Sequence, residues 1–352
     1  MTQDSHDRWR SGATPAPPAV QAGVGDQLGA ERPLPGRVVA LTGPTACGKS
    51  TLALTLAARF GGTVINADSM QVYRGLRLLT DRPGPAAMAR VPHRLYGVLR
   101  PDDPCSAARW RSLADAEIDT ALAAGRLPIL VGGTGLYLRA LLRGLAGVPA
   151  IPPAIRAAVR RRQARVSPPV LHAELAEADP AMAARLDPHD SQRVARALEV
   201  VRATGRSLAA FQAGEAGALA PTRHTVLLVA ARPPRAPLYR RIEARLATML
   251  EAGALGEVAA LRDLGLDPAL PALRAVGVPE LSTHLAGRCG RAEALAAAQA
   301  ATRRYAKRQL TWLRHQTPRD APRAFFVDAQ FSESVEPRIF NEIREFVLTA
   351  QP

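Results

Sequence analysis

"GPTACGKS", residues 43–50, is the stretch that decides the fold of this chain. It fits the pattern G-x-x-x-x-G-K-[ST], and it lies between an apolar run at residues 37–42 and an amphipathic helix, as the pattern requires. In such a loop, backbone amides and the helix N-terminus hold a di- or triphosphate, Lys49 bridges its oxygens and Ser50 is a ligand of Mg²⁺. A glycine-rich turn that only caps a helix does not explain the lysine and the hydroxyl residues after it. The sequence therefore predicts a phosphate-binding loop.

Short aliphatic runs alternate with helical stretches on both sides of this loop. The runs lie at residues 37–42, 63–68, 128–133, 225–231 and 324–328. Strands that are separated by helices form right-handed crossovers and a parallel sheet. We therefore predict an α/β fold: a P-loop NTPase-like parallel sheet flanked by helices.

Composition divides the chain into segments. Residues 1–36 are rich in Pro, Gly and Ala and lack apolar periodicity, which predicts a disordered leader. Residues 149–215 look almost wholly helical, with breaks at prolines, so we expect an all-helical insertion domain there. The α/β core then occupies residues 37–148 and 216–352, and its second part includes the C-terminal helices.

The overall composition excludes several protein classes. Lys and Arg number 46 against 31 Asp and Glu, a net charge of +15 that is typical of proteins that meet polyanions. Only two of these basic residues are lysines, Lys49 and Lys307, so compositional bias accounts for part of the charge. Three widely spaced cysteines without a C-x-x-C pair predict neither a disulfide scaffold nor a zinc site. No apolar run reaches the roughly 18 residues that span a bilayer, and we expect a soluble, cytoplasmic protein.

An acidic residue ends the second aliphatic run. Hydrolysing P-loop NTPases place such an acid at the end of another strand, to hold Mg²⁺ and position water. Here the candidate run "PILVGGTG" ends in glycines and Thr134, which argues against a motor or switch ATPase. The acid is Asp68, in "VINADSMQVY". It is either a general base that faces an acceptor or a cap of the following helix, and the residues alone leave both readings open.

Two stretches are basic and contain no acidic residue. They are "RAAVRRRQARV" at 156–166 and "TRRYAKRQLTWLRH" at 302–315. The second places Arg303, Lys307 and Arg314 near one helical face, with aromatic residues nearby. Basic residues interleaved with aromatic ones suit an RNA backbone and splayed bases. A solvated basic face is an equally good interpretation of the charge pattern alone.

Taken in order, the motifs resemble those of the tRNA dimethylallyltransferases, the IPP transferase family. The matching stretches are "GPTACGKS", "INADSMQVY", "PHRL", "GRLPILVGGTGLYLRALL", "DSQRVARALEV", "RIEARLATMLEAG", "RAVGVPEL" and "ATRRYAKRQLTWLR", which cover most of residues 37–316. After "VYRGL" the family's G-T-A-K-P-like stretch is "LLTDRP" here, a departure that we link to tRNA contact. Two more departures are "HR" for His-His and "GV" for Gly-Tyr.

The resemblance implies a reaction. The expected enzyme transfers the dimethylallyl group of dimethylallyl diphosphate to N6 of the adenosine next to the anticodon on its 3′ side, in tRNAs that read codons beginning with U. Despite the family's ATP-binding label, the loop would hold the donor diphosphate with Mg²⁺, and Ser50 would be the metal ligand. Asp68, Thr45 and Arg245 would be catalytic, with Asp68 as the base. The enzyme would be a cytoplasmic monomer.

The resemblance also assigns binding residues. The donor diphosphate would lie on Gly43, Pro44, Thr45, Ala46, Cys47, Gly48, Lys49 and Ser50. The tRNA would contact Asp68, Ser69, Met70, Gln71, Thr134, Arg156, Gln192, Arg193, Val194, Ala195, Arg196, Lys307, Arg308, Gln309, Trp312 and Arg314. The helical insertion would help to grip the anticodon stem-loop.

Three other functions remain as alternatives. One is a P-loop kinase, another an isopentenyltransferase that acts on free adenine nucleotides, and a third a non-catalytic RNA-binding P-loop protein. The helical insertion and "KRQLTWLR" favour tRNA over a mononucleotide. Asp68 together with Arg245 favours catalysis over binding alone.

Overall fold

A six-stranded, all-parallel sheet forms the centre of the core. The computed structural model describes residues 34–214, 219–315, 323–332 and 334–349, and the strand order in this part is β3-β2-β4-β1-β5-β6. The strands are β1 (Arg37–Thr42), β2 (Thr63–Asn66), β3 (His93–Arg94), β4 (Pro128–Gly132), β5 (Thr225–Ala231) and β6 (Ala324–Val327). The α/β prediction is confirmed, and five of the strands lie at the predicted runs. β3 was missed because two residues carry no periodicity.

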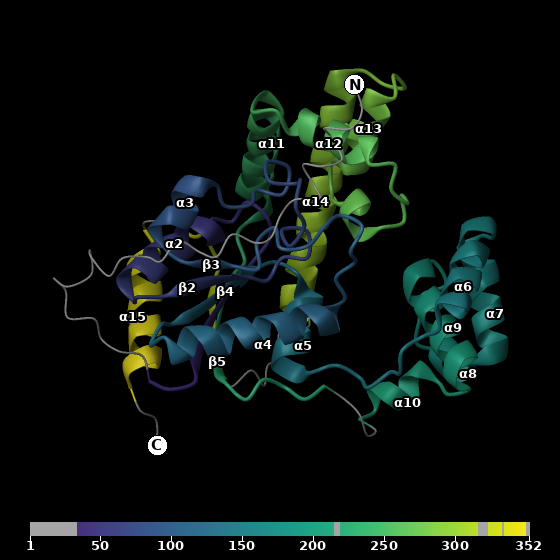
Figure 1. The fold of residues 1–352 in the computed structure, drawn as a ribbon, viewed down its shortest axis with the longest axis horizontal. Helices are drawn as coiled ribbons and strands as arrows, with labels where there is room; N and C mark the ends of the chain where they lie inside the picture. Colours follow the sequence, from purple (N-terminus) through teal and green to yellow (C-terminus); the bar gives the residue numbers. More distant parts are fainter. Residues whose placement is uncertain (1–33, 215–218, 316–322, 333, 350–352) are drawn as a thin grey trace. The chain divides into compact units, whose positions relative to one another are not determined.

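Helices cover the sheet (Figure 1). They are α2 (Lys49–Arg59), α3 (Pro85–Arg90), α4 (Ala107–Ala123), α5 (Gly135–Arg143), α11 (Arg235–Glu251), α12 (Ala254–Asp263), α13 (Val278–Leu285), α14 (Arg291–His315) and α15 (Glu336–Leu348), with a 3₁₀ turn at Pro271–Arg274. α2 packs on β1, β2 and β4, whereas α15 packs on β1 and β5. The strands β1, β2 and β4 are buried almost throughout, since both faces of the sheet are covered.

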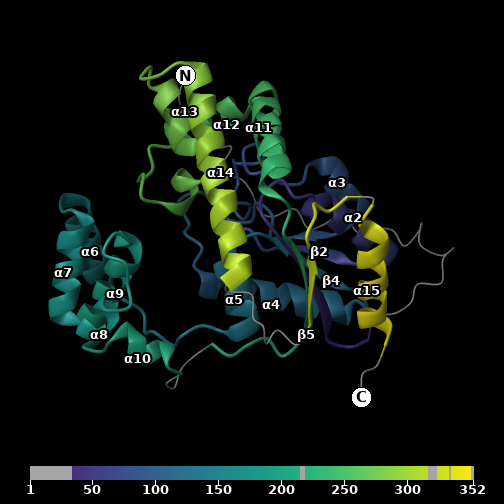
Figure 2. The ribbon, with the colours of Figure 1, turned by 180° about the vertical axis from the view of Figure 1, so that it is seen from behind.

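α11 to α14 form a second group of helices in the core. α14, the longest of the described helices, packs against α11 and α13, and both views show the four together (Figure 2). Ala294, Ala298, Thr302 and Ala306 lie on the buried side of α14. Small side chains at these positions allow close packing along the first part of the helix. The last turns of α14 thereby reach the loops at the end of the sheet.

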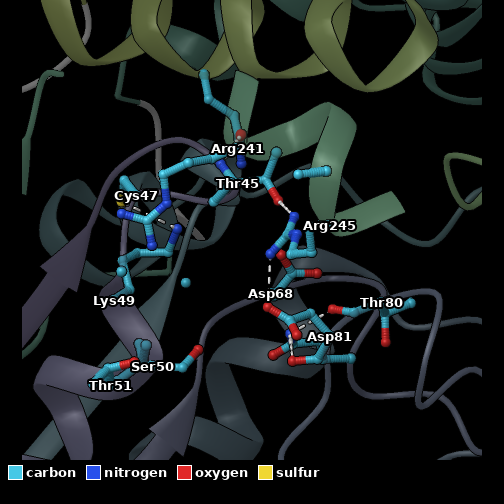
Figure 3. Close-up of a pocket in the computed structure, with 17 residues that line it drawn as sticks. Thr45, Cys47, Lys49, Ser50, Thr51, Asp68, Thr80, Asp81, Arg241 and Arg245 are labelled. Atoms are coloured by element: carbon cyan, nitrogen blue, oxygen red, sulfur yellow. Dashed lines mark hydrogen bonds and ion pairs between the residues drawn. The ribbon is translucent and has the colours of Figure 1, made fainter. Parts of the chain in front are cut away.

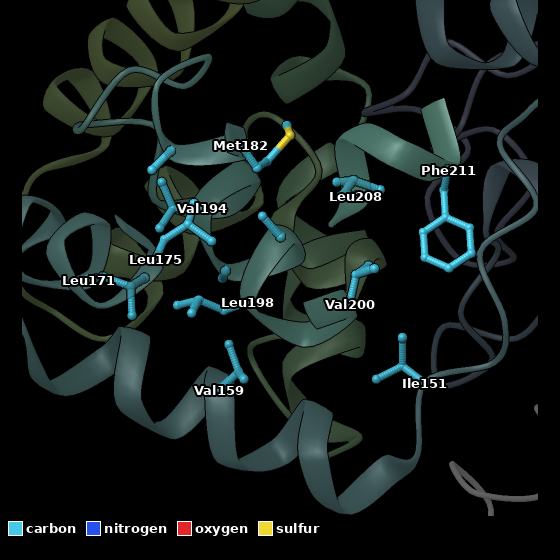
Figure 4. Packing of buried hydrophobic residues seen from close by; sticks show 13 residues of the cluster. Ile151, Val159, Leu171, Leu175, Met182, Val194, Leu198, Val200, Leu208 and Phe211 are labelled. Atoms are coloured by element: carbon cyan, nitrogen blue, oxygen red, sulfur yellow. The ribbon is translucent and has the colours of Figure 1, made fainter. Parts of the chain in front are cut away.

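The helical insertion is a compact unit of its own, residues 139–221. It contains α6 (Pro153–Arg165), α7 (Pro168–Ala178), α8 (Pro180–Ala183), α9 (Ser191–Thr204) and α10 (Leu208–Gln212). Residues such as Val159, Leu175 and Leu198 fill its interior (Figure 4). The unit is wider than the predicted 149–215 because Leu145 and Leu219 pair through two backbone hydrogen bonds of 2.9 Å. This pairing joins the two ends of the unit.

One buried acid lies inside the helical unit. The side chain of Glu199 on α9 is 2% exposed, and Arg160 of α6 donates to it at 2.8 Å. Arg196, one turn earlier on α9, approaches the second carboxylate oxygen at 3.3 Å. The two arginines satisfy the carboxylate and tie α6 to α9.

The predicted leader lies almost wholly outside the described residues, which begin at residue 34. The N–H of Leu34 donates to the carbonyl of Val347 at 3.0 Å, so the first described residue is already joined to α15. Among the described residues, no helix is both long enough and apolar enough to cross a membrane.

Candidate active site

A pocket opens where the carboxyl ends of β1, β2 and β4 meet, the usual ligand site of open α/β sheets. Its volume is about 410 Å³. Its walls come from the predicted phosphate-binding loop, the end of β2, residues 80–81, and the helices α11 and α14. Figure 3 shows Lys49 and Ser50 on one side of it, opposite Asp68, Asp81 and Arg245. The structure therefore brings the predicted loop, base and arginine together.

The loop has the geometry of a phosphate cradle that ends in a helix. Gly48 adopts a left-handed conformation, φ 93°, directly before α2. In the structure, the Lys49 ammonium donates to the carbonyls of Gly43 at 3.0 Å and Pro44 at 2.8 Å. Ser50 is exposed at the pocket, at the N-terminus of α2. Free amides at a helix start, a lysine and a hydroxyl are the groups that bind phosphate oxygens and Mg²⁺.

Two glycines, the last residue of β4 and the first residue of α5, allow neighbouring segments to approach closely. A Cβ on Gly132 would lie 2.1 Å from the backbone of Ala67, so a side chain there would displace the segment that carries Asp68. A Cβ on Gly135 would lie 2.4 Å from the ring of Trp312 on α14. The glycines that replace an ATPase acid in "PILVGGTG" thus serve close packing at the end of β4.

The carboxyl group of Asp68 is held at a turn by hydrogen bonds with the backbone and with Asn66. Its Oδ1 accepts from the N–H of Met70 at 2.8 Å, and its own N–H donates to Asn66 Oδ1 at 2.8 Å. Turns and loops, with one bridge at Tyr73, occupy the described residues between Asp68 and the next helix, α3, so the helix-cap interpretation does not hold. Burial raises the pKa of Asp68 above its ordinary value of 3.8. The hydrogen bond from Met70 and the charges of Lys49 and Arg245 oppose that rise in pKa.

Thr45 and Arg245 meet across the pocket. One Nη of Arg245 donates to Thr45 Oγ1, and the other donates to Asp81 at 2.6 Å. Arg241 precedes Arg245 by one helical turn and also lines the pocket, where it donates to Gln330 at 2.6 Å. Sequence reasoning missed Arg241 and Asp81. The spacing of four residues on α11 was a signal for Arg241, since it puts both arginines on one face.

Comparison with known proteins shows the family to which this chain belongs. The family model described as IPP transferase matches residues 71–316, and the model described as isopentenyl transferase matches residues 36–101. The chain belongs to the IPP transferase family. It is 57% identical over 279 residues to a tRNA dimethylallyltransferase of Rhodospirillum centenum, covering 79% of this chain and 88% of the relative. A tRNA dimethylallyltransferase of Rhodospirillum rubrum is 53% identical over 312 residues, covering 89% and 95%.

Solved structures are similar as well. The full-length tRNA isopentenylpyrophosphate transferase of Bacillus halodurans aligns with a TM-score of 0.63 at 32% identity, covering 89% of this chain and 97% of that one. A eukaryotic dimethylallyltransferase acting on tRNA aligns with a TM-score of 0.73 at 25% identity, covering 88% and 79%. Both the expected family and the P-loop-like α/β fold are thus confirmed.

Residues that the resemblance assigned to tRNA contact lie beside Asp68, among them Ser69, Met70 and Gln71. The N–H of Ser69 donates to Thr134 Oγ1 at 3.0 Å, which links the turn after β2 to the start of α5. Gln71 donates to the carbonyls of Thr80 at 2.8 Å and Asp81 at 3.1 Å. The "LLTDRP" departure was linked to tRNA contact, but Thr80 and Asp81 line the pocket of the phosphate-binding loop.

The assigned residues of α14 divide into two sets. Lys307, Arg308 and Arg314 are exposed, whereas Trp312 is half-buried. Gln309 is buried, and both polar atoms of its side chain have partners within the protein: Oε1 accepts from the N–H of Thr45 at 2.8 Å, and Nε2 donates to the carbonyl of Gly133 at 3.0 Å.

In the helical unit, part of the assignment needs correction. Arg156, Gln192 and Arg193 are exposed, and Arg196 is half-buried beside Glu199. Val194 and Ala195 are fully buried in the core of the unit, so their side chains cannot contact tRNA. The "QRVAR" motif includes them because this part of α9 presents an apolar face to the core of the unit.

Proposed function

We propose that this chain is a tRNA dimethylallyltransferase. It transfers the dimethylallyl group of dimethylallyl diphosphate to N6 of the adenosine next to the anticodon on its 3′ side, in tRNAs that read codons beginning with U. The observation that carries the proposal is one pocket that holds a phosphate-binding loop, two arginines and the buried carboxylate of Asp68. The names of the similar proteins support dimethylallyl as the transferred group and tRNA as the acceptor.

The pocket favours a reaction in which diphosphate leaves. Lys49, Arg241 and Arg245 provide three positive charges beside the loop. As the allylic C–O bond breaks, negative charge grows on the departing diphosphate, and such preformed cations stabilise it. We assign this task to Thr45, Lys49 and Arg245, with Arg241 as an additional cation. The new bond forms between the allylic carbon and N6.

Asp68 suits the role of general base toward that nitrogen. The adenine amine is a weak nucleophile because its lone pair is delocalised into the ring, so its proton must be accepted as the C–N bond forms. A carboxylate at the end of β2 in the same pocket as the loop is in the right region for this transfer. A pKa raised by burial makes the carboxylate a better proton acceptor than an exposed aspartate.

The residues fit Mg²⁺ bound through the substrate. Among the described residues, no group of three or more His, Cys, Asp or Glu is arranged to hold a metal ion. Ser50 offers one exposed hydroxyl at the loop. Mg²⁺ keeps several waters and commonly takes its other ligands from substrate phosphates, so one hydroxyl is sufficient. When bound, the ion would neutralise charge on the diphosphate.

The acceptor adenosine must leave the stacked anticodon loop to reach the pocket. We propose that Asp68, Ser69, Gln71 and Thr134 surround the flipped base. Exposed cations on α14 and in the helical unit would contact tRNA phosphates: Lys307, Arg308, Arg314, Arg156 and Arg193. The monomeric state and the cytoplasmic location stay predictions.

One assay tests the proposal. The protein is incubated with Mg²⁺, labelled dimethylallyl diphosphate and unmodified tRNA, and the tRNA is digested and examined for dimethylallyladenosine. Label should enter a single adenosine beside the anticodon, and none should enter when ATP replaces the donor. Efficient transfer of a phosphoryl group from ATP to a nucleotide would establish a kinase instead. Equal prenylation of AMP and tRNA would establish a mononucleotide enzyme.

A further inference from the structure

The Arg245 guanidinium is held from two sides in the pocket. Thr45 of the phosphate-binding loop accepts from one Nη, and the carboxylate of Asp81 accepts from the other at 2.6 Å. The Arg245 side chain is 27% exposed and the Asp81 side chain 51% exposed, so Asp81 is the more solvated partner of the pair. A two-point hold of this kind fixes the plane of a guanidinium better than one contact does.

Asp81 itself sits in a turn that the rest of the core holds in place. Gln71 donates to the carbonyls of Thr80 and Asp81, at 2.8 and 3.1 Å. On the other side of the turn, the carboxylate of Glu257 on α12 accepts from the N–H groups of Leu78, at 2.8 and 2.9 Å, and Leu79, at 3.1 Å. A carboxylate in such a nest of consecutive amides is a strong anchor.

The backbone conformation of Asp81 also indicates that its surroundings constrain the turn. Its φ is 57°, in the left-handed region, which costs energy for any residue but glycine and is tolerated best by Asn and Asp. Such a conformation persists where the surrounding contacts impose it. The turn therefore presents the Asp81 carboxylate to the pocket from a backbone that these contacts hold in place, although the side chain itself is exposed.

We propose that Asp81 is a positioning residue: it acts through Arg245, whose guanidinium it holds ready for the charge that develops on the leaving diphosphate. Glu257 supports this role by anchoring the turn. The inference rests on the proposed function, since it concerns the same donor site. Asp81 does not bind the donor, because its own charge repels phosphate oxygens.

This role predicts opposite effects on turnover and on donor affinity. Without Asp81, the Arg245 guanidinium loses its alignment. It then stabilises the charge that develops on the diphosphate in the transition state less well, so kcat decreases. Removal of a negative charge beside the diphosphate also removes repulsion in the ground state. KM for the donor should therefore not rise, and the affinity for inorganic diphosphate should increase.

Two variants test the role in the full-length protein. Asp81→Asn keeps the size and the tolerance for a left-handed backbone, whereas Asp81→Ala removes both acceptor oxygens. We expect kcat for tRNA prenylation to fall about threefold in the first variant and tenfold in the second. Binding of magnesium diphosphate should tighten a few-fold in both. Asp102→Ala is the matched control, since it removes an exposed Asp–Arg pair whose residues do not line the pocket.

A second readout reports on the guanidinium directly. Nitrogen relaxation of the Arg245 Nε–H group, assigned with Arg245→Lys, should show an ordered side chain in the wild-type protein and a mobile one in Asp81→Ala. Glu257→Gln should also increase this mobility, because an amide cannot accept from several N–H groups as a carboxylate does. Both changes should be visible before any diphosphate is added.

The outcomes separate the two proposals. If wild-type protein does not prenylate tRNA, the proposed function fails, and the relaxation and diphosphate-binding measurements still decide the role of Asp81. Equal order of Arg245 in wild type and Asp81→Ala would overturn the positioning role. A kcat that stays constant or rises in Asp81→Ala would also overturn the positioning role. The carboxylate would then have no effect on turnover, or it would only compete with the donor diphosphate for Arg245.

Discussion

Gln309 and Thr45 lie 264 positions apart and are joined by a hydrogen bond of 2.8 Å from the Thr45 N–H to the Gln309 side chain. The same side chain donates to the carbonyl of Gly133, so one buried amide group connects the phosphate-binding loop, α14 and the segment after β4. These three parts of the pocket come from distant parts of the sequence. The distance between the loop and the end of β4 therefore depends on Gln309.

Replacement of Gln309 by Leu should lower both stability and donor affinity. Leucine has a similar size but leaves the Thr45 N–H and the Gly133 carbonyl without partners, which costs about 1–3 kcal/mol for each buried group. We expect a lower melting temperature and a KM for dimethylallyl diphosphate that is raised about tenfold. Thermal denaturation and initial rates at varied donor concentration measure these effects.

Arg304→Ala, an exposed change on the same helix, is the control and should leave the melting temperature and the KM for dimethylallyl diphosphate unchanged. An unchanged melting temperature in Gln309→Leu, combined with weaker tRNA binding alone, would mean that the side chain serves tRNA contact as the family pattern implies.

Asp68→Asn should lower turnover by roughly two to four orders of magnitude, the usual contribution of a positioned base, while tRNA affinity is kept. Because the base must be ionised, kcat/KM of the wild-type enzyme should fall as the pH drops through the pKa of Asp68. Burial raises that pKa, so the acid limb should lie at a higher pH than for an exposed aspartate. Initial rates across the acidic range show the limb, and turnover of Asp68→Asn close to that of the wild type would exclude the general-base role.

The same variant should be more stable than the wild type at neutral pH. A carboxyl whose pKa is higher in the folded than in the unfolded state loses free energy on folding at any pH above the unfolded value. That cost disappears as the pH falls and the folded carboxyl becomes protonated. Asparagine carries no such cost, so the melting temperature should rise by a few degrees at pH 7 and converge with that of the wild type in acid. Equal melting temperatures at pH 7 would show that the hydrogen bond from Met70 and the nearby cations fully offset burial.

Arg160→Ala should destabilise the helical unit by about 2 kcal/mol, since the buried Glu199 carboxylate would then keep only the longer contact with Arg196. Hydrogen exchange should become faster in α6, α7 and α9, whereas amides of β1 and β4 should keep their protection, because the unit has its own core. Arg165→Ala, an exposed change on α6, is the control. Loss of protection in the sheet as well would show that the two units unfold together.

The fold could be predicted from the sequence because its signals are local. The aliphatic runs of β1, β2, β4 and β5 are buried on both faces, and the phosphate-binding loop has a fixed place after the first of them. The two-residue strand β3 gave no periodic signal. Its pairing with β2 arises from tertiary packing, which a local pattern does not contain.

The site could be predicted only in part. Asp68, Lys49 and Arg245 were found because motifs carry them, and the structure places all three at one pocket. Val194 and Ala195 were assigned to tRNA because a motif does not distinguish the exposed positions of a helix from the buried ones. Asp81 was missed because its partner Arg245 lies 164 positions away, and no local pattern announces such a contact.

The dependence of tRNA binding on salt should separate a tRNA enzyme from a mononucleotide enzyme. Each phosphate that a protein cation neutralises releases counterions, so the logarithm of the binding constant should fall with the logarithm of salt by roughly 0.7 to 0.9 per contact. Arg193 and Lys307 are both exposed, and the Arg193 side chain is 76% accessible despite an ion pair with Asp190 at 3.3 Å. Neither residue lines the donor pocket.

Replacing Arg193 and Lys307 by Ala should therefore flatten the salt slope by about one unit each and leave the binding of dimethylallyl diphosphate unchanged. Arg90→Ala, an exposed arginine at the end of α3, is the matched control and should not alter the slope. Fluorescence anisotropy of a labelled anticodon stem-loop across a salt series gives the binding constants of the single variants, the double variant and the control. If the double variant kept the wild-type slope, these two cations would not contact phosphates. The chemistry at Asp68 would then stand on its own, and the acceptor would have to be held by other residues.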